Sequence, residues 1–415
     1  MRHLPFMKAL AEVKDTSDPV WRDASAGYLV LRFFDRWLDD GPALASFDQT
    51  LPALKARLAS SEDVNPQVQE LLLTAVQTMI DAPGTNPSSV VGPLQAYGKY
   101  LETAGRLELA AHVYQTIMDA LDPPSGCSDP LSAAMVFKQY GMVSRLLGDF
   151  DASSDAYQRA ITLAEQANAM ELAFSTRVGM ANTLSARGNL PEAEALLSQI
   201  VANALTAKMV NAESWARHSR GVVRTLRERF VDAMMDFFRA YELTEDSYER
   251  ERILGDLAAC AGCAGYRTMA RDAYRVLAYT ARRPAVRSAA LGNLLEIAVD
   301  DNDVGDFERI QGHISIHAQK HSLSAEHALY IALYTAYGAE RFRSRDVAIA
   351  AYQSVIAQAH SLKAHQVEFK AEARLAALVA GDVLPVTPPC HEPPESLHSL
   401  VHVIAEWSEL ASRAV

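Results

Sequence analysis

The chain has 415 residues, 49% of them hydrophobic, so it can bury a large interior. Its formal net charge of −12, from 39 Lys and Arg against 51 Asp and Glu, disfavours non-specific attraction to nucleic acid or anionic membranes and favours a basic partner. Apolar runs stay well short of the ~20 residues of a membrane helix, and charged residues precede any signal-like stretch. Four cysteines are too few for a disulfide framework in so long a chain, so we expect a cytoplasmic protein.

The N-terminal part is predicted to be helical. One helix opens at Asp18-Pro19, where a cap residue precedes a proline in the first turn, and runs to Asp40-Gly41. Two more helices are expected over residues 42–60 and 66–81, before a Pro- and Gly-containing break at 82–87. We therefore predict an N-terminal helical cap over residues 1–82, built either as a separate element or from diverged repeats.

The middle of the chain repeats one pattern of small, large and aromatic residues. Small residues let neighbouring helices approach closely, large ones fill the grooves between them, and a glycine ends each first helix at a turn. Three segments fit this pattern, with their key positions at Tyr97, Gly98, Gly105, Ala110 and Tyr114; at Tyr140, Gly141, Gly148, Ser153 and Tyr157; and at Ala181, Leu184, Gly188, Ala193 and Leu197. Weaker units follow, the first with Glu228 in the glycine position.

The pattern resembles the tetratricopeptide repeat. The turn glycines at 105, 148 and 188 are 43 and 40 residues apart, so the repeat is longer than the usual period of about 34. Repeats of this length are similar to those of bacterial transcription regulators and peptide-pheromone receptors. The resemblance implies an all-α fold, a right-handed α-solenoid (superhelix) of about seven helical hairpins over residues 88–381. It also implies a concave face that holds a peptide or partner helix, and it implies no reaction. A Pro-rich linker over residues 382–394 and a C-terminal helix over 395–415 are expected to follow.

Polar residues on the first helix of each hairpin are the candidate partner contacts. The resemblance places these helices on the concave face, and its inward positions fall on Lys99, Lys138, Gln139, Asn182, His218 and Asn293. Asn182 is the most attractive, because an amide side chain can donate to and accept from a peptide backbone at once. The alternative is that these residues contact only water, as polar residues on any exposed helix face do.

A row of arginines marks the fourth hairpin. Arg217, Arg220, Arg224 and Arg227 are spaced by three, four and three residues, so they share one face of a helix. Guanidinium groups suit bidentate pairing with a partner's carboxylate or phosphate. The alternative is a solvated face whose arginines pair with acids nearby in the same chain.

Two clusters could suggest chemistry. His313, His317 and His321 share one side of a helix, but a zinc site needs further ligands from a second element. Cys260 and Cys263 form a Cys-x-x-Cys motif within a run of small residues, where cysteine serves as a small hydrophobe at a tight helix crossing. Phosphate loops, serine elbows and His-Glu-x-x-His motifs do not occur. We predict no catalytic residue, no metal site, no cofactor and no enzymatic activity.

Three functions remain open at this point. The first is a scaffold or adaptor that binds a protein or peptide in its concave groove, without nucleic acid or membrane. The second is a regulator resembling bacterial pheromone receptors, in which a peptide changes the pitch of the solenoid and moves the N-terminal helices. Those helices show no helix-turn-helix pattern and little basic charge, which speaks against direct DNA binding. The third, from another class, is a metal- or thiol-dependent enzyme using the histidines and cysteines.

Overall fold

The computed structural model describes residues 3–12, 19–40, 52–56, 58, 64–81, 86–122, 127–381 and 390–413. All regular secondary structure within these ranges is helical, which confirms the predicted all-α fold of helical hairpins. The chain forms two compact units, residues 1–212 and 213–415. None of the helices in the described ranges is long and apolar enough to cross a membrane.

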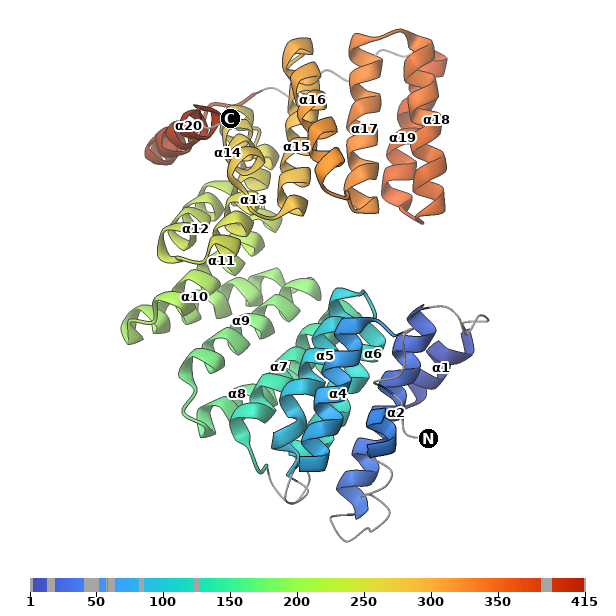
Figure 1. Cartoon of the computed structure of the whole chain (residues 1–415). Helices are drawn as coiled ribbons and strands as arrows, with labels where there is room; N and C mark the ends of the chain where they lie inside the picture. The colour runs from blue at the N-terminus through green and yellow to red at the C-terminus, as the bar shows by residue number, and fades with distance from the viewer. Residues whose placement is uncertain are drawn as a thin grey trace. The chain divides into compact units, whose positions relative to one another are not determined.

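Unit 1 begins with helices around its N-terminus and continues as hairpins. Helices α1 and α2 pack on each other and on α6, and α2 also packs on α4. The hairpins are α5–α6, α7–α8 and α9–α10 (Figure 1). The helices are α1 (Leu4–Glu12), α2 (Pro19–Asp40), α4 (Pro66–Asp81), α5 (Ser88–Thr103), α6 (Leu107–Leu121), α7 (Pro130–Leu146), α8 (Phe150–Gln166), α9 (Met170–Ala186) and α10 (Leu190–Ala207). The predicted helix over 42–60 lies largely outside the described residues.

Unit 2 continues the hairpin pattern as α11–α12, α13–α14, α15–α16 and α17–α18, followed by α19, which packs on α18. Helix α11 contains the boundary between the units. The helices are α11 (Val210–Leu226), α12 (Phe230–Leu243), α13 (Ser247–Cys263), α14 (Arg267–Thr280), α15 (Pro284–Asp300), α16 (Val304–Lys320), α17 (Ala325–Phe342), α18 (Arg345–Ser361), α19 (His365–Ala380) and α20 (His398–Arg413).

The hairpins form for the steric reasons that the repeat pattern predicts. A Cβ atom at Gly98 on α5 would lie 2.6 Å from the ring of Tyr114 on α6, so the two helices meet at this glycine. The turn after α11 places Glu228 at φ +58°, in the left-handed region that Gly105, Gly148, Gly188 and Gly265 occupy in the turns of four other hairpins. The glycine position of the repeat thus keeps its backbone conformation even where the side chain has changed.

The C-terminal segment returns to the hairpins of unit 2. Helix α20 packs along α14, with Leu400 and Ile404 buried, and the ring centroid of Trp407 lies 4.9 Å from that of Tyr241. The predicted linker falls mostly on residues 382–389, which lie outside the described residues. The predicted division into cap, solenoid, linker and C-terminal helix stays a prediction.

Candidate functional site

The first helices of successive hairpins in unit 2 lie side by side. Helix α15 packs between α13 and α17, and α17 also contacts α19. Each carries exposed or half-buried side chains at intervals of three or four residues, which places them on one face of the helix. We call the surface that these side chains form the inner face of unit 2. It comprises Asp256, Ala259, Cys263, Asn293, Glu296, Asp300, Tyr330, Tyr334, Tyr337, Lys370 and Arg374.

A pocket of about 380 Å³ opens on the inner face between α13, the start of α14 and α15. We call it the acidic pocket, because Glu296 and Asp300 line it one helical turn apart. Burial raises the pKa of both carboxyls, and the charge of Asp300 raises that of Glu296 further. Arg267, also in the lining, acts in the opposite direction on Asp300 without cancelling the effect of burial. A bound cation would stabilise the ionised form of both acids.

Three tyrosines form a row along α17 beside this pocket. Ring centroids of Tyr330 and Tyr334 are 6.2 Å apart, and those of Tyr334 and Tyr337 are 6.0 Å apart. Burial and the charge of Glu296 raise the pKa of the Tyr334 hydroxyl, and the guanidinium of Arg374 lies 4.9 Å from the Tyr337 ring centroid. Half-buried tyrosine rings offer apolar contact area and a polar edge at little cost in side-chain entropy.

A second cavity of about 540 Å³ lies at the start of α17, next to the turn between α18 and α19. We call it the apolar pocket, since Leu329, Leu362 and Val367 line it. Tyr330 belongs to both its wall and the tyrosine row. The row therefore leads from the apolar pocket to Glu296 in the acidic pocket.

The arginine row of α11 pairs largely within unit 2. Asp236 on α12, whose side chain is only 3% exposed, accepts hydrogen bonds from Arg220 at 2.7 and 2.8 Å, from Arg224 at 2.7 Å and from Arg217 at 3.3 Å. Arg227 is exposed. Pairing with nearby acids, the alternative left open by the sequence, thus describes Arg217, Arg220 and Arg224.

The other predicted contacts are divided between the two units. In unit 1 the Lys138 ammonium donates to Ser175 Oγ at 2.7 Å, and burial lowers its pKa. Lys99 is exposed and pairs with Glu102, while Gln139 and Asn182 are half-buried. In unit 2 the residues are His218, which is buried with its Nε2 2.7 Å from Asp256 Oδ2, and Asn293, which lines the acidic pocket. Their roles as partner contacts stay predictions.

The histidine and cysteine clusters have local explanations. His317 is buried, with its Nε2 3.0 Å from Ser288 Oγ, and the His313 ring meets Tyr279 edge-on. Within the ranges that the structure describes, no three His, Cys, Asp or Glu side chains are placed to hold a metal ion. Cys260 is a buried free thiol whose pKa is raised to about 11 by burial, whereas Cys263 is exposed and lines the acidic pocket.

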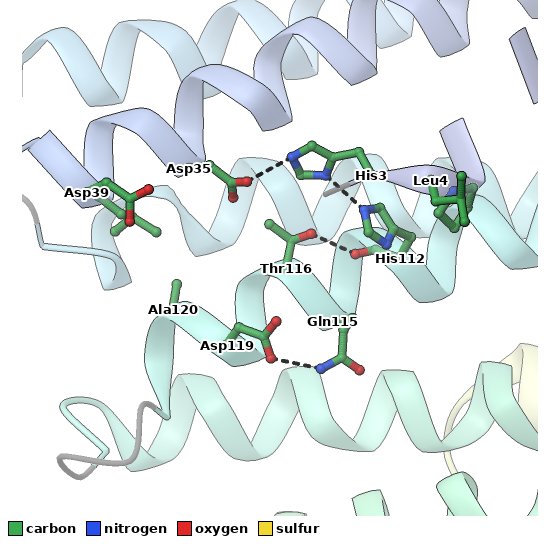
Figure 2. A pocket seen from close by; sticks show the side chains of 11 residues that line it. His3, Leu4, Asp35, Asp39, His112, Gln115, Thr116, Asp119 and Ala120 are labelled. Atoms are coloured by element: carbon green, nitrogen blue, oxygen red, sulfur yellow. Dashed lines mark hydrogen bonds and ion pairs between the residues drawn. The ribbon is translucent and has the colours of Figure 1, made fainter. Parts of the chain in front are cut away.

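A further cavity, of about 470 Å³, lies in unit 1 between the start of α1, α2 and α6 (Figure 2). His3 joins these helices, because its Nδ1 lies 2.8 Å from His112 Nε2 and its Nε2 lies 3.0 Å from Asp35 Oδ2. Burial lowers the pKa of His112 to about 4, helped by its neighbour His3. Gln115 donates to Asp119 at 2.8 Å one turn further along α6. Since these polar groups interact with one another, we interpret the side chains around the cavity as a polar network that holds α1 in place.

Comparisons with known proteins identify no family for the chain. No protein-family model matches it, and no curated protein matches it either. The structure of apo RapI is similar at 11% identity and a TM-score of 0.42, covering 93% of this chain and 97% of RapI. The apo quorum sensor NprR from B. thuringiensis is similar at 10% identity and a TM-score of 0.37, covering 90% of this chain and 91% of NprR. Similarity at this level carries no function across to this chain.

The chemistry of the inner face singles it out among these features. The unit 1 cavity and the arginine row consist of groups that already pair with each other. The inner face instead combines two cavities, a row of tyrosines and two carboxyls whose charge is poorly compensated. This arrangement is suited to a ligand long enough to contact several helices.

Proposed function

We propose that the inner face of unit 2 binds a segment of another protein, or a peptide, and that the chain is a binding scaffold rather than an enzyme. The observation that carries the proposal is the connected surface formed by the acidic pocket, Glu296, Tyr334, Tyr330 and the apolar pocket. A peptide that follows this surface has a cavity available at each end and aromatic rings between them. The free cysteines support a cytoplasmic setting for this binding.

The polar groups of the surface suit a peptide in particular. Tyrosine rings accept apolar side chains and can bond a peptide backbone through their hydroxyls. The Asn293 amide donates to the carbonyl of Ala289, and its side-chain oxygen is an acceptor for a peptide N–H. The proposal assigns recognition to these groups and no reaction.

Selection of peptides from a random display library against the whole chain tests this function. Selected peptides are then labelled and titrated by fluorescence anisotropy against the wild-type chain, Asn293→Ala and the control Gln353→Ala, whose side chain is exposed on α18. We expect Asn293→Ala to weaken binding about tenfold, corresponding to about 1.4 kcal/mol for one lost polar contact, and the control to leave it unchanged. Failure to select any peptide, or equal binding to all three proteins, would contradict the proposal.

A further inference from the structure

We propose that the segment bound by the inner face carries a lysine or arginine side chain in the acidic pocket and an apolar side chain in the apolar pocket. This inference rests on the proposed function, since it specifies the ligand of the same surface. It goes beyond that function because it names which side chains of a bound peptide the chain selects and how far apart in the peptide they lie.

Charge complementarity supports the basic side chain. Glu296 and Asp300 lie on one face of α15, separated by one turn, and both line the acidic pocket. Two carboxylates so close repel each other, and burial removes the water that would otherwise stabilise them. The ammonium of lysine or the guanidinium of arginine supplies the missing counter-charge, and a guanidinium can reach both carboxylates at once. The net charge of −12 adds a long-range attraction for basic segments.

The local cations do not already fill this role. Arg267 forms an ion pair with Asp301, with Nη1 3.0 Å from Oδ1. Lys370 of α19 acts on Glu296 only through its charge and not through a hydrogen bond. Arg374 and Arg341 also act on Asp300 through their charges, while Arg374 Nε lies 3.6 Å from Glu340 Oε2 and Arg341 donates to Asn302 at 2.8 Å. Despite these four cations, the pKa values of Glu296 and Asp300 remain above those of ordinary carboxyls. The acidic pocket therefore retains room and charge for a cation from outside.

The apolar pocket supports the second side chain. Leu329 and Val367 are buried at its base, while Leu362 is 46% exposed at its rim. An exposed leucine beside a cavity gains stability when another apolar group covers it, at about 25 cal/mol for each Å² removed from water. A leucine, isoleucine, methionine or phenylalanine of the bound segment supplies such a group.

The tyrosine row sets the spacing between the two side chains. Tyr330 at the apolar pocket and Tyr334 are 6.2 Å apart by ring centroids. The charge of Glu296 on the neighbouring helix α15 in turn acts on Tyr334. Packed helices lie about 8–10 Å apart, so the two pockets are separated by on the order of 15 Å. An extended peptide advances about 3.3 Å per residue and spans that distance in about five residues.

The residue preferences of peptides selected from the same display library test this inference. We expect peptides selected by the wild-type chain to be enriched in Lys or Arg and, about five positions away, in a large apolar residue. The double variant Glu296→Gln/Asp300→Asn should lose the basic preference and keep the apolar one. Leu362→Asp should do the reverse, and the exposed control Glu372→Gln on α19 should match the wild type. Circular dichroism establishes that each variant is folded.

Affinities then provide a thermodynamic cycle. Replacing the basic residue of a selected peptide with glutamine should weaken binding to the wild-type chain at least tenfold and to the double variant less than twofold. Peptides that bind without a basic preference, or whose preference survives the double substitution, would overturn the inference while leaving the proposed function intact. A library that yields no binding peptide would instead remove the proposed function, and this inference with it.

Discussion

Replacement of Asp236 with asparagine tests whether the arginines of α11 serve the fold or remain available to a partner. The substitution keeps the size of the side chain and removes the charge that Arg217, Arg220 and Arg224 share. Asp236 is 3% exposed and the three arginines are between 12 and 20% exposed, so the cluster is largely shielded from solvent. Arg217 would still be paired, because Glu213 lies 2.7 Å from it.

The expected loss follows from the burial of the cluster. Removing one partner of a buried ion pair costs about 3–5 kcal/mol when the remaining charge is left without compensation. The residual exposure and the contact with Glu213 place Asp236→Asn at the lower end, about 3 kcal/mol. For a unit of this size we expect the melting temperature to fall by about 6–12 °C, measured by thermal unfolding with circular dichroism.

A matched control lies on the same helix. Glu242 of α12 pairs with Arg239 at 3.1 Å, but both side chains are more than 40% exposed. Exposed pairs contribute less than about 1 kcal/mol, so Glu242→Gln should leave the melting temperature nearly unchanged. Equal and small effects of the two substitutions would refute the structural role of the arginines and return them to the candidate contacts of a partner.

Three further changes have outcomes that the structure predicts, each measured by thermal unfolding. Gly98→Ala should lower the free energy of unfolding by about 1–3 kcal/mol, because its Cβ would meet the Tyr114 ring. Gly92→Ala on the same helix, with open space around it, should raise the free energy of unfolding by about 0.5–1 kcal/mol. The reverse order would contradict the helix packing. The raised pKa of Glu296 means that its contribution to stability is present below pH 4.5 and lost as pH rises through the folded-state value, so Glu296→Gln should stabilise the chain at pH 7 and have little effect at pH 4. The lowered pKa of His112 gives the opposite sign, because its contribution to stability is present above pH 6.5 and is lost as pH falls towards 4. His112→Gln should therefore flatten the dependence of the melting temperature on pH in that window. An unchanged slope would argue against the burial of His112.

Much of the fold could be predicted because its determinants are local. The repeat reflects steric contacts within one hairpin, such as Gly98 with Tyr114, and these recur at a fixed spacing in the sequence. The turn position was recognisable even at Glu228, since the neighbouring small and aromatic residues keep the same phase. Helix ends at Pro19 and Asp81 were likewise marked by residues nearby in the chain.

The candidate site was harder to predict because it depends on which helices become neighbours. The tyrosines of α17 and the two acids of α15 have regular helical spacing, but that spacing is equally typical of a packed or a solvated face. Asn293 was selected from the repeat pattern, whereas its neighbour Glu296 was not, although both line one pocket. His3 and His112 are 109 residues apart, and no local pattern relates them.

Hydrogen–deuterium exchange of the whole chain, with and without a selected peptide, shows directly whether the inner face binds it. We expect slower exchange in α15 and α17 and in the adjoining parts of α13 and α19, with no change in α20. We also expect Glu296→Gln/Asp300→Asn to reduce this protection around the acidic pocket. Protection confined to unit 1 or to α20, with none at the inner face, would contradict binding at that face.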